Sequence, residues 1–264
     1  MNNISIPSFF LFAVLLVRAA SAQSIVNGSF ETGDFTGWQV AGIPTVLGAP
    51  PTPVDGNFQA LINSTGASAS GIYANSNSVS AATLNTFLNT TLPSSTNGSP
   101  TNGEAIQQTF TTAGSATISF SYSYQSREAP GNGFDETGYV LNGVFHVLAD
   151  TSTPGQTMAA ATGFFAHGIP YQTVTITVGP GTNTLGFVAY NTFNTSAPTG
   201  LFIDNIVLTP LTQATLDPQE STDTRATGVD GTNVVGWYDD GGGVQHGFFY
   251  NGSTYATLDP QRCV

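Results

Sequence analysis

Basic side chains are nearly missing from this sequence. Its 264 residues include no lysine and four arginines, against sixteen aspartates and glutamates, which gives a formal net charge of −12. Charged residues make up 8% of the chain, whereas about 25% is usual in a soluble domain. Nucleic acids and anionic membrane surfaces are bound through clustered lysine and arginine. The composition therefore argues against both classes of partner.

Cysteine is also scarce, because Cys263 is the only one in the chain. A single cysteine can form neither an intramolecular disulfide nor a cysteine-based zinc site. The three histidines, at positions 146, 167 and 246, are far apart in the sequence. No G-x-S-x-G motif marks a nucleophile elbow. We therefore expect a protein that is not an enzyme.

Only one apolar run is long enough to suggest a targeting segment. Residues Ile6–Val17 are almost wholly apolar, but a bilayer span needs about 20 such residues. The run has the length of a signal-peptide core, and Ala20-Ser21-Ala22 matches a cleavage site. We expect residues 1–22 to be a signal peptide. The mature protein would then be secreted or bound at the cell surface, with no membrane insertion after cleavage.

Alternating apolar and polar residues dominate the rest of the chain. In Ala116–Tyr124 every second residue is apolar or aromatic and the others are Ser or Thr, which predicts a strand with one buried face. A short helix is expected at Ala81–Leu88. Many short strands between turns favour an antiparallel sandwich or barrel. The other predicted strands are Gly56–Ile62, Ala105–Phe110, Gly138–Leu148, Gln172–Val178, Thr184–Tyr190 and Gly200–Leu208.

An internal repeat divides the chain. The residues ATLDPQ stand at 214–219 and again at 256–261, an offset of 42. A period of that length suits one small β-meander in a repeat array. We therefore expect a β-sandwich over residues 23–210 and a β-meander repeat over residues 211–264.

The longer segment, Ile25–Thr209, resembles the jelly-roll modules of bacterial exported proteins and of many carbohydrate-binding modules. This resemblance implies an all-β jelly-roll sandwich and a binding role. The absence of paired cysteines fits a bacterial exported protein better than a eukaryotic one. The residues that carry the resemblance are Asn27–Gly33, Phe35–Trp38, Asp55–Ala60, Gln107–Phe110, Ile118–Tyr122 and Leu201–Ile206.

The resemblance also implies a structural calcium ion at Glu31 and Asp204. These residues follow the first strand and stand in the last strand of the expected sandwich, and those strands commonly lie close together in a jelly roll. Two carboxylates that converge repel each other unless a cation lies between them. Calcium takes oxygen ligands, and backbone carbonyls near Ser29 and Asp55 would complete its coordination shell. The alternative is two solvated carboxylates beside turns.

A carbohydrate site would need aromatic rings that stack on sugar rings and a few polar partners. Tyr124, Arg127 and Tyr139 are the candidates for such a site on the concave face of the sandwich. The alternative for Tyr124 is the hydrophobic interior, because it shares its alternation with Phe120. For Arg127 the alternative is an ion pair with Glu128 in a loop.

The second segment, Thr215–Gln261, is similar to the HAF repeat of extracellular bacterial proteins. The matching residues are Gly228–Asp230, Val234–Tyr238, His246–Tyr250 and Thr257–Pro260. Together the two segments suggest a secreted, non-catalytic module that binds carbohydrate or another extracellular polymer. The alternative is a structural or protein-interaction component of the cell surface or matrix. In that case the repeat would mediate a protein contact or self-association.

Overall fold

The computed structural model describes residues 24–64, 78–95, 98–131, 135–158, 165–192, 197–211 and 216–258. The expected signal peptide and Cys263 lie outside these residues. The chain divides into two compact units, Met1–Leu211 and Thr212–Val264, and each is described by itself. Within the described ranges no helix has both the length and the hydropathy required to cross a membrane.

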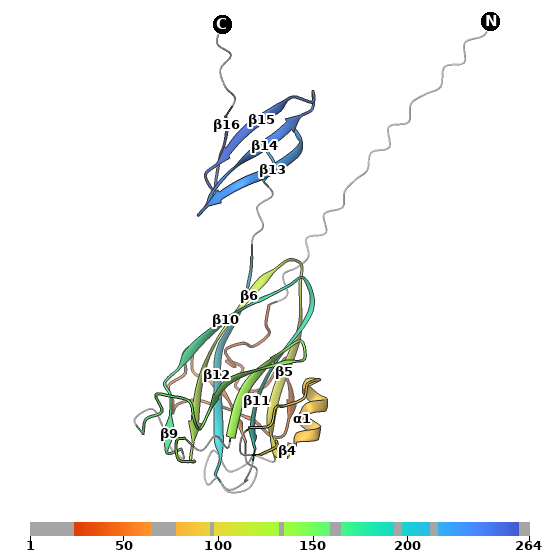
Figure 1. The fold of residues 1–264 in the computed structure, drawn as a ribbon. Coiled ribbons are helices and arrows are strands. Elements are labelled where there is room, and N and C mark those ends of the chain that lie inside the picture. Colours follow the sequence, from red (N-terminus) through yellow and green to blue (C-terminus); the bar gives the residue numbers. More distant parts are fainter. Residues whose placement is uncertain are drawn as a thin grey trace, which may run out of the picture. The chain divides into compact units, whose positions relative to one another are not determined.

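The first unit is a jelly-roll sandwich of two antiparallel sheets (Figure 1), so the predicted all-β fold class is confirmed. Sheet A has the order β1 (Gln39–Ala41), β5 (Asn102–Thr112), β11 (Gly181–Asn191), β7 (Asp135–Leu141) and β8 (Val144–Asp150), with β4 (Val79–Ser80) also pairing with β5. Sheet B has the order β10 (Gln172–Val178), β6 (Ala116–Ser126), β12 (Thr199–Pro210), β3 (Gln59–Asn63) and β2 (Thr45–Leu47), with β9 (His167–Gly168) also pairing with β6.

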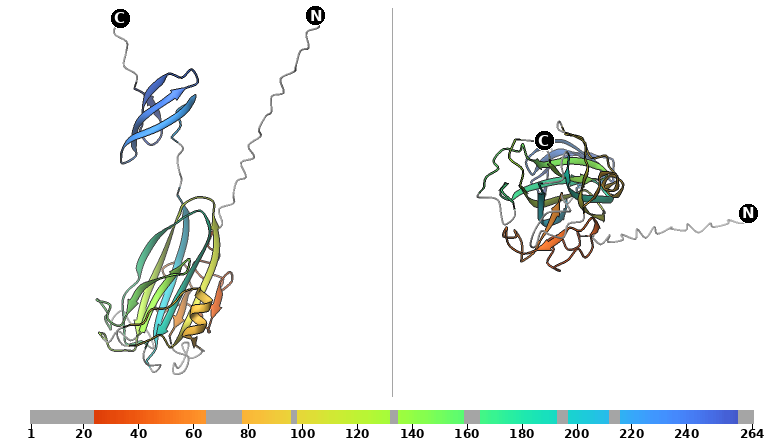
Figure 2. Two further views of the ribbon diagram at one scale, coloured as in Figure 1. Left: turned by 45° about the vertical axis from the view of Figure 1, so that its right-hand side comes forward. Right: turned by 90° about the horizontal axis from the view of Figure 1, so that it is seen from below.

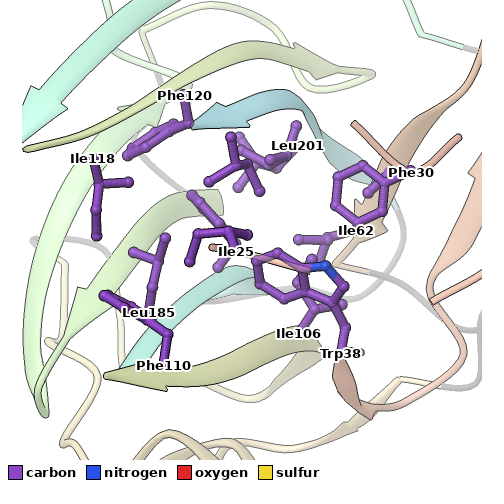
Figure 3. Packing of buried hydrophobic residues seen from close by; sticks show 14 of the residues in the cluster. Ile25, Phe30, Trp38, Ile62, Ile106, Phe110, Ile118, Phe120, Leu185 and Leu201 are labelled. Atoms are coloured by element: carbon purple, nitrogen blue, oxygen red, sulfur yellow. The ribbon is translucent and has the colours of Figure 1, made fainter. Parts of the chain in front are cut away.

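The predicted alternation places the core between the two sheets. Ile118 and Phe120 of β6 are fully buried and face sheet A, where the ring of Phe120 meets Phe187 edge-on at 4.9 Å. Trp38 is buried beside Phe30, with ring centroids 5.7 Å apart. Figure 3 shows both rings within the cluster of buried apolar residues that forms the core. Trp38 is thus a core residue.

One predicted strand is wrong, because Gly138–Leu148 forms the two strands β7 and β8 of a hairpin. Asn142 and Gly143 connect them with φ angles of 51° and 82°. Asn-Gly is the sequence that a two-residue type I′ turn prefers, since both central residues need positive φ. The turn signal was therefore present in the sequence, between the apolar residues of Tyr139–Leu141 and Val144–Phe145.

The predicted helix is confirmed as α1 (Ala81–Leu88). Ser80 caps its N-terminus by accepting a hydrogen bond from the backbone N–H of Thr83 at 3.3 Å, and Asn89 ends it in the left-handed conformation. Leu84 and Leu88 lie one turn apart and are buried against the outer face of sheet A. In the view of Figure 2 from below, the helix lies on the outside of the sandwich.

The second unit contains a four-stranded antiparallel meander: β13 (Ser221–Asp230), β14 (Asn233–Asp240), β15 (Gln245–Tyr250) and β16 (Tyr255–Thr257). Phe248 is its large, fully buried apolar side chain. His246 lies against Tyr238 with ring centroids 5.1 Å apart, and its Nε2 is 3.2 Å from Asp240 Oδ2. The likeness to the HAF repeat stays a prediction.

Candidate functional site

A pocket of about 330 Å³ lies on the outer face of sheet A, next to the C-terminal end of α1. The helix covers one part of this face through an apolar cluster that includes Leu88 and Val188. Gly186 permits this contact, because a Cβ at that position would lie 2.6 Å from Leu88 Cδ2. Beyond the helix the sheet face is polar, and there the pocket opens.

The pocket is lined by uncharged polar groups and one aromatic ring. Two strands supply its floor, the end of the helix supplies one wall, and the β7–β8 turn supplies another. Its volume lies at the lower end of the range typical of small-ligand sites. The lining side chains include Phe87, Asn89, Gln107, Thr109, Asn142 and Thr184.

Hydrogen bonds hold several of these side chains in place. Asn142 accepts a hydrogen bond from the backbone N–H of Thr184 at 2.8 Å, and the Thr184 and Thr109 hydroxyls are 3.1 Å apart. Gln107 donates to Gln39 of the neighbouring strand at 3.0 Å. The pocket therefore presents amide and hydroxyl groups whose positions are largely fixed before a ligand arrives.

The close approach of two segments shapes the pocket wall. A Cβ at Gly143 would lie 2.8 Å from the backbone oxygen of Asn89, so only glycine lets the hairpin turn come this near to the end of the helix. The sequence alone did not reveal this site. Its signals were the Asn-Gly turn and the outward-facing polar residues of β5, neither of which indicates that the two regions meet.

The three residues predicted to bind carbohydrate have different surroundings. Tyr124 is fully buried in β6, so its ring has no exposed face, and the prediction that it stacks on a sugar is wrong. Tyr139 is half-buried, packs edge-on against Phe120, and stacks on His146 with centroids 4.6 Å apart. Arg127 is exposed after the end of β6. None of the three lines the pocket beside α1.

The two carboxylates predicted to hold calcium converge on one loop segment. Asp204 is fully buried and its Oδ2 accepts hydrogen bonds from the backbone N–H groups of Val54 and Asp55 at 2.6 and 2.9 Å. Glu31 is exposed, and its Oε1 accepts from the N–H groups of Asn57 and Phe58, both at 2.8 Å. Both carboxylates therefore contact the segment 54–58, Asp204 at its start and Glu31 at its end.

The same geometry gives the carboxylates a second use, because they fix residues 54–58 through backbone N–H groups. Asn205 N–H also donates to Asp204 Oδ1 at 2.7 Å, and Asn57 Nδ2 donates to Glu31 Oε2 at 3.4 Å. A carboxylate has about four acceptor positions, so each keeps roughly one for a cation. Burial raises the pKa of Asp204, against the effect of its N–H donors.

Ser29, the third predicted metal-site residue, contacts the same loop. Its hydroxyl donates to Asp55 Oδ2 at 2.6 Å, so the Asp55 carboxylate joins Glu31 and Asp204 around this segment. Among the described residues no group of three or more His, Cys, Asp or Glu side chains is arranged to hold a metal ion. Calcium binding here stays a prediction.

Comparison with known proteins gave neither a matching family model nor a matching curated protein. Several solved structures resemble the fold, three of which follow. The carbohydrate-binding module TmCBM61, in complex with β-1,4-galactotriose, is 13% identical, with 69% of this chain and 94% of that chain covered and a TM-score of 0.36. The K1 cleaved adhesin domain of Lys-gingipain from Porphyromonas gingivalis is 11% identical, with 70% and 96% covered and a TM-score of 0.40. A family 35 carbohydrate-binding module from an environmental isolate is 15% identical, with 65% and 88% covered and a TM-score of 0.25. At these scores the function has to be inferred from this chain's own side chains.

Proposed function

We propose that this protein is a secreted, non-catalytic module that binds a neutral carbohydrate in the pocket beside α1. The observation that carries the proposal is the lining of that pocket, which combines amide and hydroxyl side chains with one aromatic ring and no charged group. Sugar hydroxyls both donate and accept hydrogen bonds, as do amide and hydroxyl side chains.

The absence of charge from the lining supports an uncharged ligand. A charged side chain facing a neutral ligand would lose hydration without gaining an ionic partner, which is costly. Phe87 supplies an apolar ring, and such a ring suits the CH groups of a sugar. Because Asn142, Thr184 and Thr109 are already held by hydrogen bonds, binding would cost little further side-chain ordering.

Calcium bound by Glu31 and Asp204 belongs to the same proposal as a structural ion. Its support is that both carboxylates bind the backbone of residues 54–58, where Ser29 also holds the Asp55 carboxylate. When bound, the ion would neutralise these carboxylates and link the last strand to the loop. The carboxylates themselves orient the loop through its backbone N–H groups.

Binding to a panel of immobilised neutral glycans tests the proposal. Thr109→Val removes a hydroxyl from the pocket floor while keeping the β-branched shape that strands prefer. One lost hydrogen bond of about 0.5–1.5 kcal/mol should weaken binding about 2- to 10-fold. Thr175→Val, an equally exposed threonine on β10 of sheet B, is the matched control and should bind like the unmodified protein.

Two results would overturn the proposal. One is the absence of retention on any neutral glycan of the panel. The other is retention that Thr109→Val and Thr175→Val weaken equally, because binding would then lie outside the pocket. Self-association or capture by a defined protein partner, together with no glycan binding, would instead support the role as a structural or interaction protein.

A further inference from the structure

The inward-facing residues of the sandwich change from apolar to polar toward one end. Along β6 the residues facing sheet A run from Ile118 and Phe120 to Tyr124 and Ser126. The same change occurs at the matching ends of the strands around it, where Ser64, Asn102, Glu104, Asp135, Asn191 and Thr199 take inward positions. Five of these six side chains are buried, and Asn102 is half-buried. We call this region the polar end.

A hydrogen-bond chain joins the two sheets at the polar end. Ser64 donates to Asp135 Oδ2 at 3.2 Å and accepts from the N–H of Thr199 at 2.9 Å. The hydroxyl of Thr199 donates to Ser126 at 2.9 Å, and Ser126 also accepts from the N–H of Glu128 at 3.0 Å. The chain thus links the Asp135 carboxylate to the backbone of Glu128.

Within the part of the chain that the structure describes, three fully buried oxygen atoms at this end have no hydrogen-bond partner: Asp135 Oδ1, Asn191 Oδ1 and the Tyr124 hydroxyl. Asn191 and Asp135 are direct cross-strand neighbours. Tyr124 lies close enough to Asp135 for the charge of Asp135 to contribute to the raised pKa of the Tyr124 hydroxyl. An unsatisfied buried polar atom costs about 1–3 kcal/mol, so native proteins rarely keep several together. These atoms therefore indicate a missing partner.

The charges at the polar end point to the same partner. Asp135 is fully buried, and Glu128, which is 6% exposed, lies near enough to repel it. Burial, followed by this repulsion, raises the pKa of Asp135 from 3.8 to about 8. A proton or a cation relieves such repulsion between two buried carboxylates.

We propose that Asp135, Glu128, Asn191 and Tyr124 form a buried binding site for a calcium ion. Two carboxylates, a side-chain amide oxygen and a hydroxyl are hard oxygen donors of the kind that calcium takes. The pairing of β7 with β11 places Asp135 beside Asn191, and the electrostatic effects of Asp135 on Tyr124 and of Glu128 on Asp135 place these two residues nearby.

The site is separate from the one at Glu31 and Asp204. Asp204 shares its alternation along β12 with Phe202, which packs in the small cluster on the outer face of sheet B. Thr199 shares its alternation with Leu201 and Ile203 of the core between the sheets. The polar end therefore lies inside the sandwich, whereas Asp204 faces the loop at residues 54–58 on its outside.

Calorimetric titration of the mature protein with calcium chloride tests the proposal. With only two carboxylates, the affinity should fall in the range of weak extracellular sites, about 10⁻⁴–10⁻³ M. Asp135→Asn should lower the number of bound ions by one, whether or not the Glu31 and Asp204 site also binds. Asp34→Asn removes an exposed carboxylate of a turn and should leave the number unchanged.

An Asp135→Asn variant that binds as many ions as the unmodified protein would overturn the proposal, because a proton on Asp135 would then satisfy this end. If that variant does not fold, Tyr124→Phe decides the question. It removes one oxygen while keeping the ring, and about tenfold weaker calcium binding is expected. It should also reduce the emission of bound terbium excited through tyrosine. Unchanged affinity and emission would refute the site.

Discussion

Glu104 is a buried carboxyl group whose titration should be visible in the stability of the whole sandwich. It is fully buried in β5 and accepts hydrogen bonds from the backbone N–H groups of Asn63 at 2.9 Å and Ile43 at 3.3 Å. These donors favour the ionised form, but the loss of hydration outweighs them. Burial therefore raises the pKa of Glu104 from 4.5 to about 7.

The sign of the effect follows from linkage between protonation and folding. Between pH 4.5 and 7 the folded state holds a proton on Glu104 that the unfolded state has lost, so stability falls as the pH rises. The stabilisation is complete below pH 4.5 and is lost as the pH passes through about 7. A pKa difference of this size corresponds to about 3 kcal/mol, or a fall of about 6–12 °C in melting temperature.

Unfolding by urea, followed by circular dichroism from pH 4 to 8 with chelator present, measures this dependence. Glu104→Gln keeps the size of the side chain and removes its titration. The difference between the two curves isolates Glu104, because Asp135 and all other groups titrate in both proteins. The unmodified protein should lose about 3 kcal/mol more than the variant across this range. Parallel curves for the two proteins would refute the reasoning.

Two further predictions concern the loop at residues 54–58 and the helix. If calcium binds at Glu31 and Asp204, about a hundredfold excess over its dissociation constant should raise the free energy of unfolding of the protein by about 2.7 kcal/mol. Asp204→Ala should remove that part of the calcium-dependent rise in melting temperature. An undiminished rise in this variant would contradict the site. Leu84→Ala removes a fully buried side chain of α1 and should lower the free energy of unfolding in urea by about 2–5 kcal/mol. Thr86→Ala, at an exposed position of the same helix, should change it by no more than about 0.5 kcal/mol. Equal effects of the two substitutions would show that the helix does not pack on sheet A.

Local pattern predicted the elements whose signals lie within a few residues. The alternation of Gln172–Val178 matches β10 and the spacing of Leu84 and Leu88 matches α1, because burial on one face repeats with the period of the element itself. The wrong prediction of one strand at Gly138–Leu148 also concerned a local signal, because the two residues Asn142 and Gly143 form the turn. The meeting of Glu31 and Asp204 on one loop was anticipated only through the resemblance to jelly rolls.

The sequence by itself determined the β-rich composition, the strand alternation, the helix and the scarcity of basic groups. Only the tertiary structure decided that β5, β11, the end of α1 and the β7–β8 turn enclose a neutral pocket. It also decided that Asp135, Asn191 and Tyr124 meet at a buried polar end. The physical reason is that the two-residue alternation of a strand shows only which residues share one face of that strand. Strand order and register decide which distant residues lie on the same face of the sheet.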